Sequence, residues 1–292
     1  REMRDGSGGF YATQDADVDG EEGVYYLWDY GEVESVIGAA GAQSLASYYS
    51  LTRAGNYEGG NMLRMNPNAR PPDATVDEGI KGLLAELFEA RGRRAAPRTD
   101  RKIITAWNGL AITALVEAGS LFERGDLIEA AGRCARFLLE SVEDGHGRLL
   151  RYHLDGKARV AALLEDYALF ADSLLVLNEA TGDKAWLDPA QGLITEMIRL
   201  FYDPEDRLFY DTGADQRRLF VRERDLYDND VPSGNSAAAD LLLRASRLLG
   251  EARYRRLCEE ILRTVESMDD EPLSYGNFLC VNESISGDKE RR

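Results

Sequence analysis

The stretch TAWNGLAITALVEAGSLFERGD, residues 105–126, shows the plan on which the chain is built. A polar motif, Trp107-Asn108-Gly109, opens a run whose apolar residues recur at helical intervals, and the run ends at Gly125-Asp126, where a second amphipathic run begins. The same plan recurs from Glu165-Asp166-Tyr167 and from Ser233-Gly234-Asn235-Ser236. Internal repetition at this scale indicates stacked helix pairs.

The spacing predicts three helical hairpins, each with an inner helix followed by an outer one. Their ranges are 106–123 with 127–141, 167–180 with 186–202, and 236–249 with 254–268. We expect Gly125, Gly182 and Gly250 to separate the two helices of each pair. After two of the outer helices, aromatic and aliphatic runs at 149–152 and 208–210 predict short strands.

The start of the chain repeats the phrase that follows an outer helix. Gly8-Gly9-Phe10-Tyr11 matches the strand-like run at 208–210, so the chain begins just after a hairpin that it does not contain. Its first residue is Arg1 rather than Met. We therefore expect a fragment of a longer chain.

Composition limits the classes of function. The chain has 292 residues, of which 44% are hydrophobic and 30% charged, which is typical of a globular protein. A net charge of -17 argues against nucleic acid or an anionic membrane as partner, because such a surface repels phosphate. No apolar run approaches the ~20 residues of a membrane span, and residues 1–9 lack a signal-peptide pattern. Cys134, Cys258 and Cys280 are odd in number and widely separated, which predicts free thiols and a cytoplasmic location.

The polar motifs are expected to meet at one end of the fold. When antiparallel helix pairs stand in a ring, the inner helices run the same way, so their N-termini gather at one mouth. The acidic loop 15–23 follows the Gly8–Tyr11 phrase and is expected on that same rim. This concentration of carboxylates, amides and aromatic side chains predicts a ligand site.

A set of ordered motifs points to a known family. They are Gly8-Gly9-Phe10-Tyr11 with Asp15-Ala16-Asp17 and Gly20-Glu21-Glu22-Gly23, then Gly55-Asn56-Tyr57-Glu58-Gly59, Thr105-Ala106-Trp107-Asn108-Gly109-Leu110, Leu164-Glu165-Asp166-Tyr167-Ala168 and Pro232-Ser233-Gly234-Asn235-Ser236. Together they resemble the YyaL-like family of thioredoxin-domain-containing proteins. Members of that family join an N-terminal thioredoxin-like domain to an (α/α)6 toroid similar to six-hairpin glycosidases and N-acylglucosamine 2-epimerases.

The resemblance implies an all-α fold, an incomplete α/α toroid of the six-hairpin glycosidase type with short β-hairpins on the motif-bearing rim. It also implies that residues 1–292 are a single toroid domain fragment, the C-terminal part of a parent chain whose thioredoxin-like domain lies outside this sequence. The chain departs from the family at Asp100-Arg101-Lys102, where two acidic residues usually precede the lysine.

Glu165 and Asp166 at a helix start allow two interpretations. They cap the helix and complement its dipole, or one of them acts as general acid or base toward a sugar. Glycoside hydrolysis needs two carboxyl groups that flank the bond, and Asp230 or Asp17 is the candidate for the second. We predict Glu165, Asp166 and Asp230 as catalytic residues, and Asp17 as a substrate ligand.

The remaining motif residues suit a sugar ligand or a structural role. Ser233 and Asn235 follow Pro232 and form a good helix cap, while the N–H groups exposed there also suit a sugar hydroxyl. Trp107 beside Asn108 suggests a stacking platform next to an amide. Tyr167 is a second stacking candidate, although both aromatic residues also suit a core.

A calcium site is considered and set aside. Asp15, Asp17, Asp19 and Gly20 match the opening of an EF-hand loop, but the position that needs a bidentate Glu holds Tyr26. We therefore expect no metal and no cofactor.

Histidine usage separates two enzyme classes. Epimerases of the related fold resemble one another in using paired histidines, whereas this chain has only His146 and His153, both outside the inner helices. There is no Cys-x-x-Cys, P-loop or dinucleotide motif either.

We therefore predict a carbohydrate-binding or carbohydrate-processing domain that acts through rim carboxylates. If it is an enzyme, its activity is expected to resemble that of a glycoside hydrolase or, with less support from the histidines, a sugar epimerase. The alternative is a non-catalytic scaffold that binds a protein or peptide for the attached thioredoxin-like domain.

Overall fold

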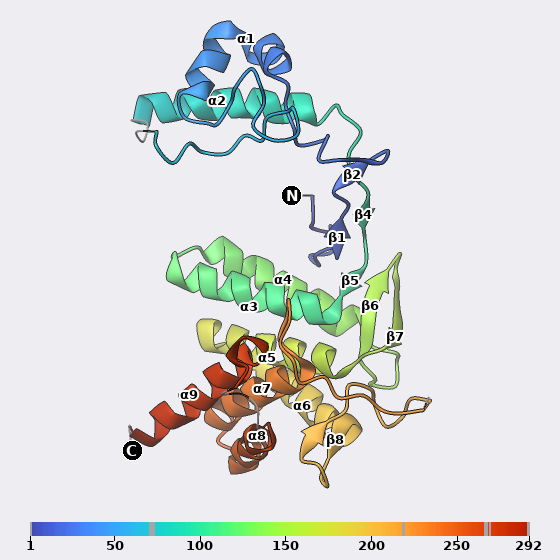
Figure 1. Ribbon diagram of the computed structural model, residues 1–292. Helices are drawn as coiled ribbons and strands as arrows, with labels where there is room; N and C mark the ends of the chain where they lie inside the picture. Colours follow the sequence, from blue (N-terminus) through green and yellow to red (C-terminus); the bar gives the residue numbers. More distant parts are fainter. Residues whose placement is uncertain (1, 70–73, 218–219, 266–267, 269, 291–292) are drawn as a thin grey trace. The chain divides into compact units, whose positions relative to one another are not determined.

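The computed structural model describes residues 2–69, 74–217, 220–265, 268 and 270–290 (Figure 1). It divides into two compact units, which we call the hairpin unit (Arg1–Ala12 with Arg101–Arg292) and the inserted unit (Thr13–Asp100). Among the described residues, no helix has the length and apolar character needed to cross a membrane.

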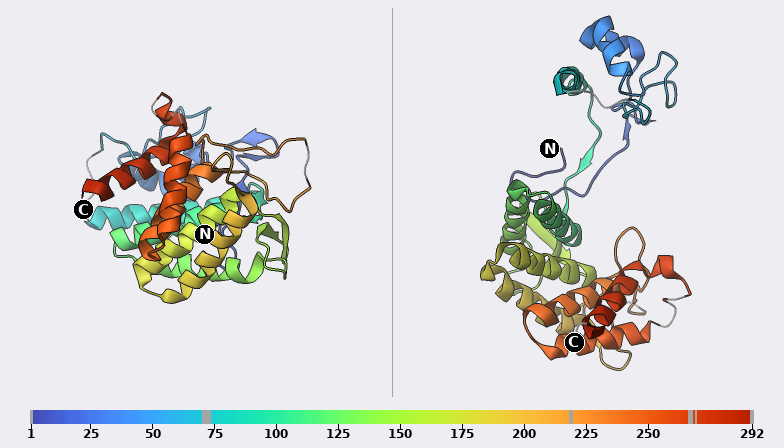
Figure 2. Two further views of the ribbon diagram at one scale, coloured as in Figure 1. Left: turned by 90° about the horizontal axis from the view of Figure 1, so that it is seen from below. Right: turned by 90° about the vertical axis from the view of Figure 1, so that its left-hand side faces the viewer.

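The hairpin unit is a stack of helix pairs. Its inner helices are α3 (Thr105–Leu121), α5 (Leu164–Thr181), α7 (Gly234–Leu248) and α9 (Gly276–Glu290), and its outer helices are α4 (Gly125–Ser141), α6 (Leu187–Phe201) and α8 (Ala252–Thr264). The 3-10 turns η1 (Lys184–Trp186) and η2 (Pro272–Ser274) precede α6 and α9. Each inner helix packs on the next, and α4, α6 and α8 each pack on the inner helix before them (Figures 1 and 2). This arrangement is an arc of an α/α toroid, and it confirms the predicted fold class.

The six predicted helices are confirmed, with ends that differ by a few residues. Gly182 ends α5 in the left-handed conformation, at φ 66°, as expected of a glycine at a helix C-terminus. The stop predicted at Gly125 is wrong, because Gly125 is the first residue of α4 and the left-handed position in that turn falls on Glu123. The predicted third outer helix extended to residue 268, and residues 266–267 lie outside the described residues.

Short strands accompany the starts of the inner helices. A three-stranded antiparallel sheet has the order β5 (Ile103–Ile104), β6 (Leu150–Leu154), β7 (Lys157–Ala161), and a second sheet pairs β8 (Tyr202–Asp203) with β9 (Leu208–Phe209). In the first sheet Ile103 lies opposite His153, and in the second Tyr202 lies opposite Phe209. Because β5 runs directly into α3 and β7 ends shortly before α5, these strands lie at the end where the inner helices begin.

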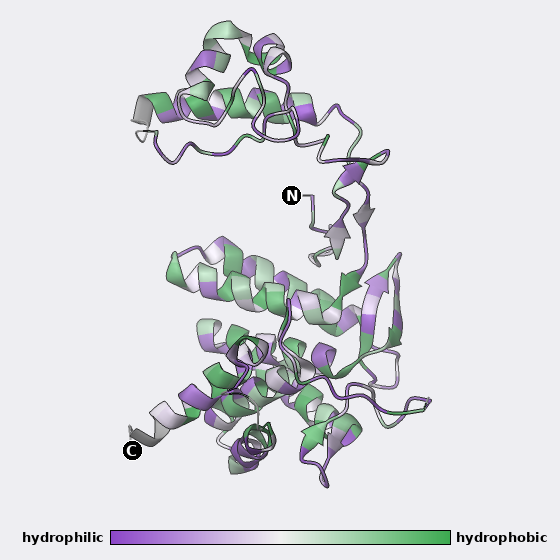
Figure 3. Cartoon of the chain, in the orientation of Figure 1, coloured by the Kyte–Doolittle hydropathy of each residue, from purple (hydrophilic) through white to green (hydrophobic). Residues whose placement is uncertain are grey.

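The core of the hairpin unit is centred on α5. This helix packs against α3 on one side and α7 on the other, and Phe170, Leu174 and Leu175 are fully buried. A helix that is apolar around most of its circumference is expected at such a central position. Figure 3 shows hydrophobic residues along much of α3 and mostly hydrophilic residues in the long connections.

In the part of the inserted unit that the structure describes, helices are accompanied by short β pairs. They are α1 (Tyr30–Ala46), α2 (Ala74–Arg91), β1 (Thr13–Gln14) paired with β4 (Thr99–Asp100), and β2 (Asp17–Val18) paired with β3 (Glu21–Glu22). The helices pack over Trp28, Leu45 and Leu87. The toroid-like arrangement of inner and outer helices is found in the hairpin unit. That residues 1–292 form a single toroid domain stays a prediction.

Candidate functional site

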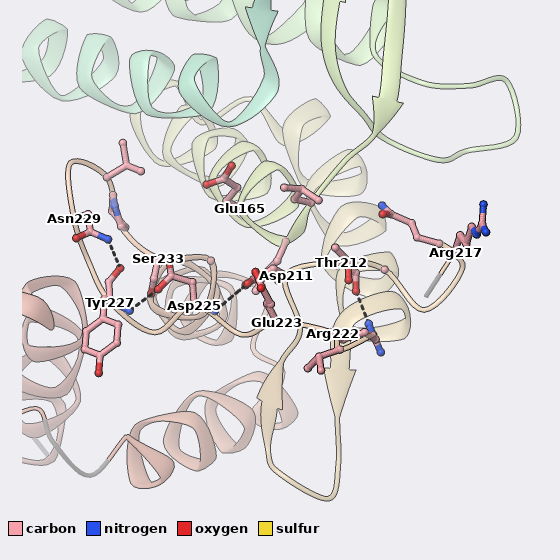
Figure 4. Close-up of a pocket in the computed structure, with 18 residues that line it drawn as sticks. Glu165, Asp211, Thr212, Arg217, Arg222, Glu223, Asp225, Tyr227, Asn229 and Ser233 are labelled. Carbon is pink, nitrogen blue, oxygen red and sulfur yellow. Dashed lines mark hydrogen bonds between the residues drawn. The ribbon is translucent and has the colours of Figure 1, made fainter. Parts of the chain in front are cut away.

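A cavity of about 500 Å³ lies in the hairpin unit where α5 and α7 begin (Figure 4). Its walls come from the start of α5, from the segment after β9, and from the connection that leads into α7. Among the described residues, the side chains with carboxyl groups that line it are Glu165, Asp211, Glu223 and Asp225. Tyr227, Ser233 and Thr212 add hydroxyl groups.

Asp211 is fixed in place by backbone contacts on both sides. Its side-chain oxygens accept hydrogen bonds from the Asp225 backbone N–H at 2.9 and 3.2 Å, and its own N–H donates to the Glu223 carbonyl. The N–H of Leu164 donates to the Asp211 carbonyl at 3.0 Å, which ties the residue to the start of α5. Burial, together with the negative charges of Asp225, Glu165 and Glu223, raises the pKa of Asp211 to about 6.

The sequence analysis missed Asp211. The available signal was its place directly after the predicted strand at 208–210, where the chain enters the rim. Glu223, Asp225 and Tyr227 were missed because they lie in a connection without periodicity, where no pattern marks which side chains face a cavity.

Glu165, one of the predicted catalytic residues, lies on α5 and lines the cavity. Its carboxylate is 2.8 Å from a guanidinium nitrogen of Arg151, a residue of β6. The same guanidinium reaches Asp166 through its other terminal nitrogen, at 3.1 Å. Arg151 therefore holds two adjacent carboxylates by separate nitrogens, a geometry that suits a guanidinium better than an ammonium.

Asp166 is fully buried and is not among the described residues that line the cavity. Its carboxylate accepts hydrogen bonds from the backbone N–H groups of Ala106 at 3.0 Å and Leu163 at 2.9 Å. Burial raises the pKa of Asp166 to about 6, against the opposing influence of the Arg151 charge. These contacts give Asp166 the capping role, and they join the starts of α3 and α5.

The two aromatic candidates lie in different environments. Tyr167 is fully buried, and its hydroxyl accepts hydrogen bonds from the Leu149 N–H and from Arg148. Trp107 is 40% exposed at the start of α3 and is not among the described lining residues. The contacts of Tyr167 are those of a core residue, whereas Trp107 keeps an accessible ring.

Asn108 and Asn235 make the same contact in two repeats. The side-chain oxygen of Asn108 accepts from the Phe10 N–H at 2.7 Å while its amide nitrogen donates to the Phe10 carbonyl at 3.0 Å. Asn235 pairs in the same way with the N–H and carbonyl of Phe209, at 2.8 and 2.9 Å. Both amides are buried and fasten a strand-like segment to the inner helix that follows.

The other predicted site residues are dispersed. Ser233 caps α7 by accepting from the Ser236 N–H at 3.1 Å, and it also lines the cavity. Asp230 is exposed and is not among the described lining residues. Asp17 belongs to the inserted unit, where it pairs with Glu22, so its predicted place on the rim stays a prediction. Among the described residues, no group of His, Cys, Asp and Glu could hold a metal ion.

The cavity therefore offers a carboxyl group whose pKa is raised to about 6, Asp211, and a second carboxylate beside a guanidinium, Glu165. A proton donor and a carboxylate in one cavity are the equipment of general acid and base catalysis.

Comparisons with known proteins give relatives of the sequence and of the fold. No family model matches the chain. The chain is 32% identical over 300 residues to human Spermatogenesis-associated protein 20, which covers 88% of this chain and 38% of that protein. It spans about two fifths of the length of the curated relatives it matches.

Among solved structures, the chain is similar to a GH76 α-mannanase of Bacteroides thetaiotaomicron, at 15% identity over 82% of this chain and 58% of that one, with a TM-score of 0.48. It is also similar to a sugar epimerase from a ruminal bacterium, at 15% identity over 91% of this chain and 67% of that one, with a TM-score of 0.47.

Proposed function

We propose that this chain is the carbohydrate-processing portion of a larger YyaL-like protein, and that the cavity at the starts of α5 and α7 binds its sugar substrate. The observation that carries the proposal is that Glu165 and Asp211 line one cavity in different environments. The ordered motifs of the sequence support the family assignment. The attached thioredoxin-like domain and the cytoplasmic location stay predictions.

In this proposal Asp211 is the proton donor and Glu165 is the second carboxylate. Cleavage of a glycosidic bond needs an acid that protonates the leaving oxygen, and a carboxyl group with a raised pKa keeps its proton at the pH where a free aspartate would lose it. Glu165, held by Arg151, then activates water or stabilises the positive charge that develops on the sugar ring. Asp166 acts only through Arg151, and the predicted roles of Asp230 and Asp17 remain untested.

The test is a thermal-shift screen of the chain against neutral, amino and acidic mono- and oligosaccharides, followed by a hydrolysis assay on each binder. A ligand that binds only the folded chain must raise its melting temperature. We expect Glu165→Gln and Asp211→Asn to fold normally and to abolish turnover, with a loss of at least about 100-fold.

Glu205→Gln is the matched control, because Glu205 is an exposed carboxylate between β8 and β9 and is not among the described lining residues. Turnover that survives in both cavity variants would overturn the catalytic assignment. If no sugar shifts the melting temperature of the well-folded chain, the scaffold alternative is favoured instead.

A further inference from the structure

The charges around the cavity are unequal. Four carboxyl side chains line it, whereas the cationic side chains along its walls are Arg217 and Arg222, among the residues that the structure describes. Whether the cavity attracts or repels a charged sugar therefore depends on where these two guanidinium groups point.

The two guanidinium groups lie in different surroundings. Arg222 donates to the backbone carbonyls of Leu200 and Thr212, and its guanidinium carbon lies 3.9 Å from the centre of the Tyr210 ring. Figure 4 shows Arg217 at the far edge of the cavity with its guanidinium directed away from Asp211 and Glu165. Arg222 therefore contacts the protein's own backbone and the Tyr210 ring, and Arg217 lies at the edge of the cavity.

The carboxyl side chains of Glu165, Asp211, Glu223 and Asp225, in contrast, all line the cavity (Figure 4). Burial raises the pKa of Asp211 most, and the negative charges of Asp225, Glu165 and Glu223 add to that rise. The four carboxyl groups on its walls give the cavity a negative potential, although Arg151 balances part of the charge of Glu165. The same potential acts on any ligand that enters.

We infer that the cavity selects sugars that carry a free amino group over neutral sugars, and neutral sugars over uronic acids. This inference rests on the proposed function, since it concerns the substrate class of the same site. An ammonium group offers three N–H donors to side chains that only accept when ionised, and its charge is attracted by Glu223 and Asp225. A sugar carboxylate would add a like charge at the same place.

Glu223 is the specificity-determining residue that can be tested most cleanly. It is exposed on the cavity wall, so replacement by Gln removes its charge with little expected effect on folding. It has no part in the proposed catalytic pair. Asp225→Asn is the second variant, because its side chain can still accept the Tyr227 N–H through the amide oxygen.

The experiment uses sugars of the gluco, galacto and manno configurations. For each configuration, it compares the 2-amino sugar, the neutral sugar and the uronic acid. Their dissociation constants are measured by NMR titration of the whole chain at pH 6.5. On any ring that binds, we expect the amino sugar to bind about tenfold more tightly than the neutral sugar and the uronic acid to bind more weakly. Glu223→Gln and Asp225→Asn should each reduce the preference for the amino sugar over the neutral sugar about threefold, whereas Glu205→Gln should leave this preference unchanged.

The outcomes separate the two proposals. Equal or tighter binding of neutral sugars or uronic acids overturns the amino-sugar inference and leaves the proposed function in place. A preference that persists unchanged in both folded variants also overturns it. If no sugar of any class binds, the proposed function fails and the inference fails with it.

Discussion

The carboxylate of Asp166 on α5 accepts a hydrogen bond from the backbone N–H of Ala106 on α3 at 3.0 Å, across 60 positions of sequence. The first N–H groups of a helix have no partner within the helix, so a buried helix start needs an acceptor from elsewhere. Asp166 supplies that acceptor to α3 and, through Leu163, to its own helix. A residue predicted to be catalytic is thus the link between two inner helices.

Replacement of Asp166 by Ala should lower the free energy of unfolding by about 3 kcal/mol, because it leaves the N–H groups of Ala106 and Leu163 without their acceptor and removes one of the two carboxylates that Arg151 contacts. Chemical denaturation measures this change. Asp126→Ala, at an exposed aspartate of α4, is the control and should have a much smaller effect. Equal effects of the two substitutions would show that the link contributes little.

Asn235→Asp should also destabilise the chain, by about 3 kcal/mol, since a carboxylate oxygen would replace the donor that faces the Phe209 carbonyl in a buried site. Asn108→Asp should behave in the same way at Phe10. Asn229→Asp, at an exposed residue of the cavity wall, is the matched control. If either buried variant keeps its stability but loses sugar affinity, the predicted role as a hydroxyl ligand is supported instead.

Some parts of the structure could be predicted from the sequence because they depend on local patterns. Helical periodicity is local, so the three helix pairs were predictable, and the strands at 149–152 and 208–210 carried a local pattern too. The fourth inner helix, α9, was missed, although Gly276-Asn277 repeats the Gly234-Asn235 of α7.

The roles of individual polar residues were less predictable because their partners are distant. Asn108 and Phe10 are 98 positions apart, and nothing local indicates that the amide is occupied by backbone. In the same way, the sequence marked Glu165 and Asp166 equally, and only the packing places one on the cavity wall and the other in the core. The raised pKa of Asp211 comes from its burial and from charges that folding brings together.

The pKa of Asp211 gives a prediction for stability against pH. Its ordinary value of 3.8 rises to about 6 in the folded chain, so the folded chain binds this proton more tightly than the unfolded chain does. The stabilising contribution is therefore complete below about pH 4 and is lost as the pH rises through about 6. Asp211→Asn removes this dependence. Relative to the wild type, it should gain about 1 kcal/mol at neutral pH, allowing for solvent screening at a partly exposed group.

Urea unfolding of both proteins at about pH 4 and about pH 7.5 measures this difference. Asp166 and Asp172 also have raised pKa values, but they are present in both proteins and cancel in the comparison. A difference that stays constant between the two pH values would contradict the raised pKa of Asp211.

The last prediction concerns the spacing of α3 and α5. A methyl group added at Gly109 would lie 2.7 Å from the backbone carbon and oxygen of Leu169, so the two helices would have to separate. Gly109→Ala should therefore lower the free energy of unfolding by about 1 to 3 kcal/mol. Gly192→Ala, in α6, meets no atom within 4 Å and should raise the free energy of unfolding by about 0.5 to 1 kcal/mol, because alanine favours the helix.

The same substitution at Gly109 should also affect sugar binding. Because Asp166 joins the same two helices near this contact, Gly109→Ala should displace the start of α5 and lower the affinity for sugar, whereas Gly192→Ala should retain that affinity. Unchanged stability and affinity in Gly109→Ala would show that the packing of α3 against α5 does not position the cavity.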